Sequence, residues 1–284
     1  MTQKYSERRQ RGITMFKKIA VFAFAALGLV ACGGGGGGGS SAPAAKTMKL
    51  SLYGQPFTKS QAVSHARVVA SASTPSSDAA ATVQTLQDAL AARGVPATVT
   101  AQVMDGTTLH QIVMGENNGL PPTPDQFKTD PSEYLIVNFQ LDDMVTPSTD
   151  AAQAASISQF AQDLTVFTQR AAVSGKLVYA VLPIQTCDAP NGTGAAFGLM
   201  EAIRAAQNHS NLNTMGAIPF GVAFGGSQGN AIPTPELVHL GADCRTPDAY
   251  LLNMRTNAIA DYIATLYKQA TAPAPASGAS ATGT

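Results

Sequence analysis

The sequence predicts a three-layer α/β/α sandwich around a mostly parallel, five-stranded sheet. Short strand-like segments alternate with helix-like segments along the chain, which is typical of a parallel α/β fold. Residues 134–139 form a compact apolar segment, of the kind that is buried on both faces of such a sheet. Residues 47–268 are long enough for one sizeable domain and short for two, so we expect a single core.

The first half of this domain supplies three of the strands. A strand over residues 48–53 alternates apolar and polar side chains and ends at Gly54. A helix follows it, predicted from three apolar residues at helical spacing: Val83, Leu86 and Leu90. β-branched residues then predict a strand over residues 97–103, before a turn at residues 105–108 and the apolar third strand.

The second half supplies two more strands and three helices. The next helix has an apolar stripe made of Ile157, Phe160, Leu164 and Phe167. A fourth strand is predicted over residues 176–183, a helix over residues 197–207 and a weaker strand over residues 215–222. After a Gly-rich stretch, a closing helix presents one face made of Ala258, Ile259, Tyr262, Ile263 and Leu266.

The chain begins with the features of a secretory signal. Lys17 and Lys18 precede an apolar run, residues 19–30, that is too short to span a bilayer comfortably. The run closes on Leu-Val-Ala before Cys32, which resembles the lipobox of bacterial lipoproteins. We therefore expect a signal peptide over residues 1–31 and a lipid on Cys32 that anchors the chain to a membrane. A transmembrane anchor fits poorly, because seven glycines follow at once.

Both flanks of the domain are predicted to be unstructured. Residues 32–46 hold the lipidated cysteine and a Gly/Ser-rich tether, and residues 269–284 form a disordered tail. Gly33 follows Cys32 where an aspartate would retain a lipoprotein in the inner membrane, which resembles an outer-membrane address. The expected location is the periplasmic face of a bacterial membrane. Either Met1 or Met15 could be the true start.

Charge argues against nucleic acid as a partner. The full chain carries 18 basic and 18 acidic residues, and residues 1–31 hold six of the basic and one of the acidic ones. The processed chain would thus keep 12 basic and 17 acidic residues, a net charge of −5 with neutral histidines. A phosphate backbone normally needs a basic patch.

Two cysteines remain after processing, Cys187 and Cys244. The periplasm permits disulfides, so we expect the two to be paired, with two free thiols as the alternative. No Cys or His residues cluster at metal-ligand spacing. No cofactor is expected, because the glycine run is the tether and does not join a strand to a helix.

The residues that follow the predicted strands, together with those before the closing helix, form four short blocks. They are Gly54-Gln55-Pro56, Asp105-Gly106-Thr107, Gln140-Leu141-Asp142-Asp143 and Asp243-Cys244-Arg245-Thr246-Pro247. Their order and spacing resemble the SGNH (GDSL) hydrolases over nearly the whole domain. The resemblance implies a flavodoxin-like sandwich and an ester hydrolase. In that family a serine attacks the ester carbonyl, a histidine takes its proton and an aspartate orients the histidine. The backbone of the first block, the glycine of the second block and the asparagine of the third donate hydrogen bonds to the oxyanion.

The first two blocks match the family only at their glycines. Gly54 is kept, but Gln55 occupies the aspartate position and Pro56 the nucleophile position. Proline has no hydroxyl and cannot act as the nucleophile. Gly106 matches the glycine of the second block.

The last two blocks also depart from the pattern. Gln140 stands where a glycine is expected, and Asp142 stands where the oxyanion-hole asparagine is expected. A carboxylate at that place would repel an oxyanion. Asp243 matches the family aspartate, but Thr246 replaces the histidine and cannot accept a proton near neutral pH.

The sequence therefore predicts a domain that keeps the fold but has no intact catalytic set. We expect a binding module for a carbohydrate or an acyl ester. The alternative is an active ester hydrolase with non-standard residues, such as Thr58 or Ser60 as nucleophile and His65 as base. A purely structural or adhesive role in the envelope is a third hypothesis.

Other polar residues receive ordinary structural roles. The four histidines are scattered and are expected to lie at the surface or behind a site: His65, His110, His209 and His239. Asp142 and Asp143 could form a carboxylate pair or bind calcium, but adjacent residues seldom aim at one atom. We expect Asp143 to cap a helix or a turn.

Overall fold

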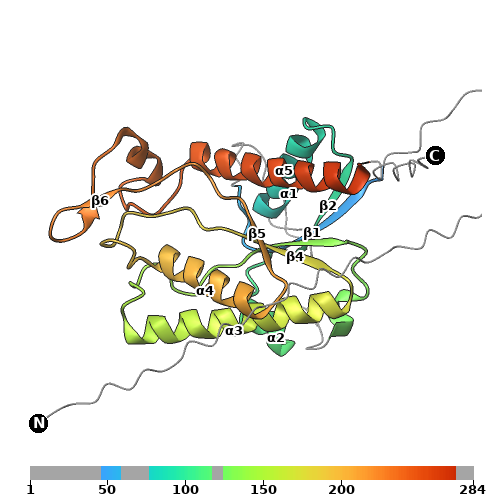
Figure 1. The fold of residues 1–284 in the computed structure, drawn as a ribbon, viewed down its shortest axis with the longest axis horizontal. Coiled ribbons are helices and arrows are strands. Elements are labelled where there is room, and N and C mark those ends of the chain that lie inside the picture. The colour runs from blue at the N-terminus through green and yellow to red at the C-terminus, as the bar shows by residue number, and fades with distance from the viewer. Residues whose placement is uncertain (1–45, 59–76, 117–123, 273–284) are drawn as a thin grey trace, which may run out of the picture. The chain divides into compact units, whose positions relative to one another are not determined.

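The computed structural model describes residues 46–58, 77–116 and 124–272 (Figure 1). They belong to one compact unit, residues 45–284, and the second unit, residues 1–44, lies outside the described residues. Five parallel strands form the central sheet in the order β2-β1-β3-β4-β5. Their bounds are β1 Met48–Gly54, β2 Ala97–Val103, β3 Tyr134–Asn138, β4 Leu177–Val181 and β5 Asn213–Met215.

Helices cover both faces of this sheet, which makes the three-layer sandwich that the sequence predicted (Figure 1). α1 and α5 lie on one face, and α2, α3 and α4 lie on the other. Their bounds are α1 Ser77–Ala91, α2 Leu109–Met114, α3 Ala151–Val173, α4 Ala195–His209 and α5 Ala249–Thr271. The strand order is that of flavodoxin-like sheets, in which the chain changes face between β1 and β3.

Strand β1 shows why the sheet is buried on both faces. Leu50 and Leu52 pack with residues of α1 and α5, whereas Tyr53 packs with residues of α2 and α3. Ser51, on the Tyr53 face, is also fully buried. Its hydroxyl donates to Asp130, whose other carboxylate oxygen accepts from the Tyr53 hydroxyl at 3.0 Å. A buried carboxylate is tolerated here because donors surround it.

The structure differs from the sequence predictions at several boundaries. β5 has three residues, 213–215, instead of the strand expected over 215–222. The segment after the turn at 105–108 continues as α2, which Thr108 and Gln111 begin with a capping box. Two short 3₁₀ helices, Pro124–Phe127 and Pro235–Leu240, and a hairpin of β6 Phe224–Gly225 and β7 Asn230–Ala231 were not predicted.

The closing helix is also longer than expected. α5 runs to Thr271, so residues 269–271 are helical rather than part of the tail. The predicted signal peptide at residues 1–31, the tether at residues 32–46 and lipidated Cys32 lie almost wholly outside the described residues. Within the described part of the chain, no helix is both long and apolar enough to cross a membrane.

Candidate functional site at the carboxyl ends of the strands

Asn138, the last residue of β3, joins the first and third blocks. The Gln55 N–H donates to the Asn138 carbonyl oxygen at 2.8 Å, and Asn138 Nδ2 donates back to the Gln55 carbonyl oxygen at 2.7 Å. Gln140 Nε2 lies 3.4 Å from Asn138 Oδ1. The sequence predicts Asn138 only as a residue of the third strand. In the structure its buried amide joins the ends of β1 and β3, between which the chain passes from one face of the sheet to the other.

Gly54 allows this close approach. Its φ is +90°, and a Cβ at this position would lie 2.7 Å from the backbone carbon of Asn138. No other residue type fits without moving one of the two strands. The glycine of the first block is therefore explained by the geometry of the strand ends, with or without catalysis.

A cleft of about 520 Å³ opens beside the segment that follows β3. Its walls come from both ends of α2, the segment after β3 and residues 156–163 of α3. They are Thr108, Leu109, His110, Gln111, Glu116, Gln140, Leu141, Asp142, Ser156, Gln159, Phe160 and Asp163. We call this the switch-point cleft. Most of its lining side chains are polar, and ligands of open parallel sheets bind outside the carboxyl ends of strands at such a point.

A histidine and a carboxylate are paired in the cleft. His110 Nδ1 lies 3.0 Å from Asp163 Oδ2, and Gln159 Nε2 donates to the other oxygen of the same carboxylate at 3.0 Å. The Asp163 side chain is 7% exposed and that of His110 is 52% exposed. When Asp163 accepts from Nδ1–H, the Nε2 atom of His110 is left as a proton acceptor. The sequence predicts that His110 lies at the surface or behind a site, and it gives no sign of the pairing with Asp163.

The third block is divided between two roles. Gln140 and Asp142 line the cleft. Asp143 does not, because Asp143 Oδ1 accepts hydrogen bonds from the N–H groups of Val145 and Thr146. These bonds and one with the Thr146 hydroxyl hold the pKa of Asp143 below its ordinary value. Asp143 caps a turn, as predicted.

The second block contributes through its neighbours. Gly106 is exposed in a turn with φ +96° and does not line the cleft. The turn directs the chain into α2, which brings Thr108 and His110 to the cleft wall.

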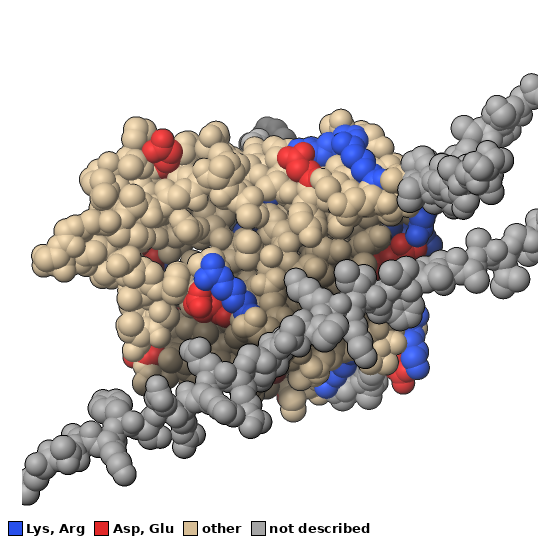
Figure 2. Space-filling model, in the orientation of Figure 1, with Lys and Arg blue, Asp and Glu red and all other residues tan. Residues whose placement is uncertain are grey.

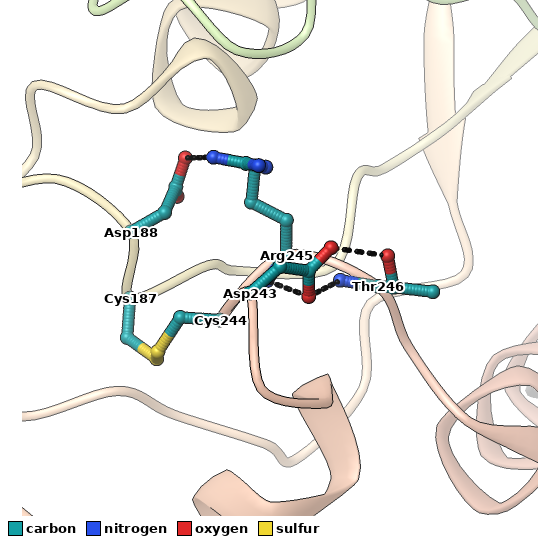
Figure 3. Close-up of a disulfide and its surroundings, with 6 residues drawn as sticks. All are labelled: Cys187, Asp188, Asp243, Cys244, Arg245 and Thr246. Atoms are coloured by element: carbon teal, nitrogen blue, oxygen red, sulfur yellow. Dashed lines mark hydrogen bonds and ion pairs between the residues drawn. A yellow bond between two sulfur atoms is a disulfide. The ribbon is translucent and has the colours of Figure 1, made fainter.

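Asp243 and Thr246 of the last block do not line the cleft, and they are hydrogen-bonded to each other (Figure 3). Asp243 accepts from the Thr246 hydroxyl at 2.6 Å and from the N–H groups of Arg245 and Thr246. The Thr246 hydroxyl and these backbone bonds lower the pKa of Asp243 to about 2. Both oxygens of this carboxylate are therefore used to shape its own loop. The second paired histidine, His239, lies 2.7 Å from Asp248 at the start of α5 and does not line the cleft either.

Thr58 is also turned away from a catalytic role. Its side chain is buried, and its hydroxyl lies 2.9 Å from that of Thr82 in α1. The alternative hydrolase with Thr58 or Ser60 as nucleophile therefore loses Thr58, because its hydroxyl is used in packing against α1. Ser60 and His65 lie outside the described residues.

The structure pairs Cys187 with Cys244, as the sequence predicted. The bond joins the segment after β4 to the last block, with a Cα–Cα distance of 5.0 Å (Figure 3). The Cys187 N–H also donates to the Cys244 carbonyl oxygen, and Arg245 lies 3.5 Å from buried Asp188. Together these contacts fix the loop that carries Asp243 and Thr246. Among the described residues, no group of three His, Cys, Asp or Glu side chains could hold a metal ion.

A second, smaller cavity of about 230 Å³ lies beside the segment that follows β4 and has a different character. The segment after β4, the start of α4 and the segment that leads into β6 surround it, and its walls include Ile184, Phe197, Met200, Val222 and Phe224. These walls are mainly apolar, so the cavity suits an apolar group better than a sugar.

Comparison with known proteins finds likeness only among solved structures. No family model matches the chain, and no curated protein matches it. A candidate SGNH hydrolase from Slackia heliotrinireducens is 13% identical, covers 77% of this chain and 100% of its own, and has a TM-score of 0.44. A structure described as TesA is 19% identical, with coverages of 76% and 97% and a TM-score of 0.41. A candidate acylhydrolase from Bacteroides fragilis is 12% identical, with coverages of 79% and 92% and a TM-score of 0.39. These values concern the fold at most, and no activity follows from them.

Proposed function

We propose that this chain is a lipid-anchored envelope protein whose domain binds a carbohydrate in the switch-point cleft and does not hydrolyse esters by the SGNH mechanism. The proposal rests on the residues that occupy the positions which the resemblance gives to the nucleophile and the base. Pro56 offers no nucleophile, and Thr246 gives its hydroxyl to Asp243. Losing either nucleophile or base typically costs a serine hydrolase several orders of magnitude in rate.

The character of the cleft supports a carbohydrate over an acyl chain. Side-chain amides, carboxylates and hydroxyls supply hydrogen-bonding groups on every wall, among them Gln111, Gln140, Asp142 and Gln159. A polyhydroxylated ligand can replace the water that such groups bind, whereas an acyl chain would leave them unpaired. The face of the molecule in Figure 2 carries only small, separate groups of charged side chains, which offers no broad basic surface for nucleic acid.

Calorimetric titration with soluble cell-envelope oligosaccharides tests this proposal. Asp142→Ala should weaken binding at least tenfold, because Asp142 is exposed within the cleft. Asp88→Ala is the matched control, since Asp88 is an exposed carboxylate on α1, outside the cleft. Equal affinities for the two variants would remove the cleft from the proposal.

A second candidate function is an ester hydrolase that uses the His110–Asp163 pair. His110 Nε2 would take a proton from water as the water oxygen attacks the ester carbonyl, and it would return that proton to the leaving alcohol. Asp163 would hold the imidazole and stabilise its charged form. This candidate predicts hydrolysis that His110→Ala and Asp163→Asn both abolish.

A further inference from the structure

Arg255 is a buried cation that has no counterion among the described residues. It lies on α5 and is 7% exposed. Its Nε atom is buried and has no hydrogen-bond partner within the described residues. Removing an ion from water costs several kcal/mol in typical proteins, so an uncompensated guanidinium in this position needs an explanation.

The other described arginines show that this is exceptional. Each of them has a partner: Arg93 with Asp261, Arg170 with the Val113 carbonyl oxygen, Arg204 with Glu201 and Arg245 with Asp188. The two aspartates that flank Arg255 along α5 are engaged elsewhere, Asp248 with His239 and Asp261 with Arg93. The neutralising charge for Arg255 is therefore not supplied by these residues.

The aliphatic part of the Arg255 side chain lies near the ends of two strands. Gly216 directly follows β5, and a Cβ there would lie 3.6 Å from Arg255 Cγ and 3.3 Å from Val181 Cγ1. A Cβ at Gly216 would crowd Ile259, at 3.1 Å, more than Arg255, and the Arg255 stem lies close to the ends of β4 and β5. This is the carboxyl edge of the sheet, where ligands of open parallel sheets bind. Desolvation lowers the pKa of Arg255 to about 10, so the group keeps its charge at neutral pH.

We propose that the Arg255 guanidinium anchors a binding site for a small oxyanion, either a carboxylate or a phosphate. The planar guanidinium presents paired N–H groups that match two oxygens of such an anion, and burial strengthens each of these bonds. The site is separate from the switch-point cleft, because Arg255 is not among the residues that line the cleft. It therefore goes beyond the proposed carbohydrate function and can be right when that function is wrong.

Melting temperatures of the purified protein test the proposal. Phosphate, sulfate or acetate is titrated at constant ionic strength, with sodium chloride as the balancing salt. A saturable rise in melting temperature is expected, and Arg255→Met should raise the half-saturating concentration at least tenfold. Arg204→Met is the control, because it removes an exposed cation from α4. A preference for acetate would identify a carboxylate ligand, and a preference for phosphate or sulfate would identify a tetrahedral one.

Two results would overturn this inference. One is the absence of any rise beyond that given by sodium chloride alone, and the other is an equal response in Arg255→Met. If Arg255→Met does not fold, Arg255→Lys decides the question. Lysine keeps the charge but loses the paired N–H groups, so an unchanged response in Arg255→Lys would also contradict the proposal.

Discussion

Removing the Cys187–Cys244 disulfide is expected to lower the free energy of unfolding by about 4 kcal/mol. The bond joins residues 57 positions apart in the sequence. In the closed-loop entropy model, a loop of this length restricts the unfolded chain by roughly that amount. For a domain of this size the loss corresponds to a fall of about 8–16 °C in the melting temperature.

Urea unfolding of the double variant Cys187→Ser, Cys244→Ser beside the wild type measures this loss. Dithiothreitol should destabilise the wild type to the level of the double variant and should leave the double variant unchanged. A loss below about 1 kcal/mol would refute the reasoning, because the unfolded chain would then gain little freedom from breaking the loop. A reductant effect on the double variant would show that something other than this bond is responsible.

Three further predictions concern the frame and the last block. Gly94→Ala should lower the free energy of unfolding by about 1–2 kcal/mol, because Gly94 has a positive φ and an added Cβ would meet no neighbouring atom. Gly54→Ala should cost about 1–3 kcal/mol more, because its Cβ meets the backbone of Asn138, and equal losses in urea unfolding would contradict this. Asp130→Ala should lower the free energy of unfolding by about 2–4 kcal/mol, because the donors on Ser51, Tyr53 and Ser132 would stay buried without an acceptor. A loss below about 1 kcal/mol in urea unfolding would contradict this role of Asp130. Asp243 has its pKa lowered from 3.8 to about 2, so its charged form stabilises the folded state above about pH 4, and this contribution is lost as the pH falls towards 2. Acid unfolding of Asp243→Asn should lack that part of the pH dependence, and an unchanged profile would sink the assignment.

Local patterns predicted the layers of this fold well. Apolar residues at helical spacing marked α1, α3 and α5, and β-branched residues marked β2 to its observed bounds. The switch-point cleft, which Gln140 and Asp142 line, was not predicted from these patterns.

The residues of the cleft could not be brought together from the sequence alone. His110 and Asp163 are 53 residues apart, and no periodicity links residues on different helices. α2 was missed because it has only six residues, although the Thr108 and Gln111 capping box was a readable signal. The role of Asn138 was not predicted, because a polar residue at the end of an apolar segment indicates only where the strand ends. Its role appears only when β1 and β3 are aligned side by side.

The most direct test of the central claim is hydrolysis of short-chain and acetylated-sugar p-nitrophenyl esters by the purified protein. We expect rates for the wild type that do not exceed the uncatalysed reaction and do not change in Asp243→Ala or His110→Ala. Turnover by the wild type that disappears in His110→Ala would contradict it and establish an ester hydrolase with a rebuilt site in the switch-point cleft.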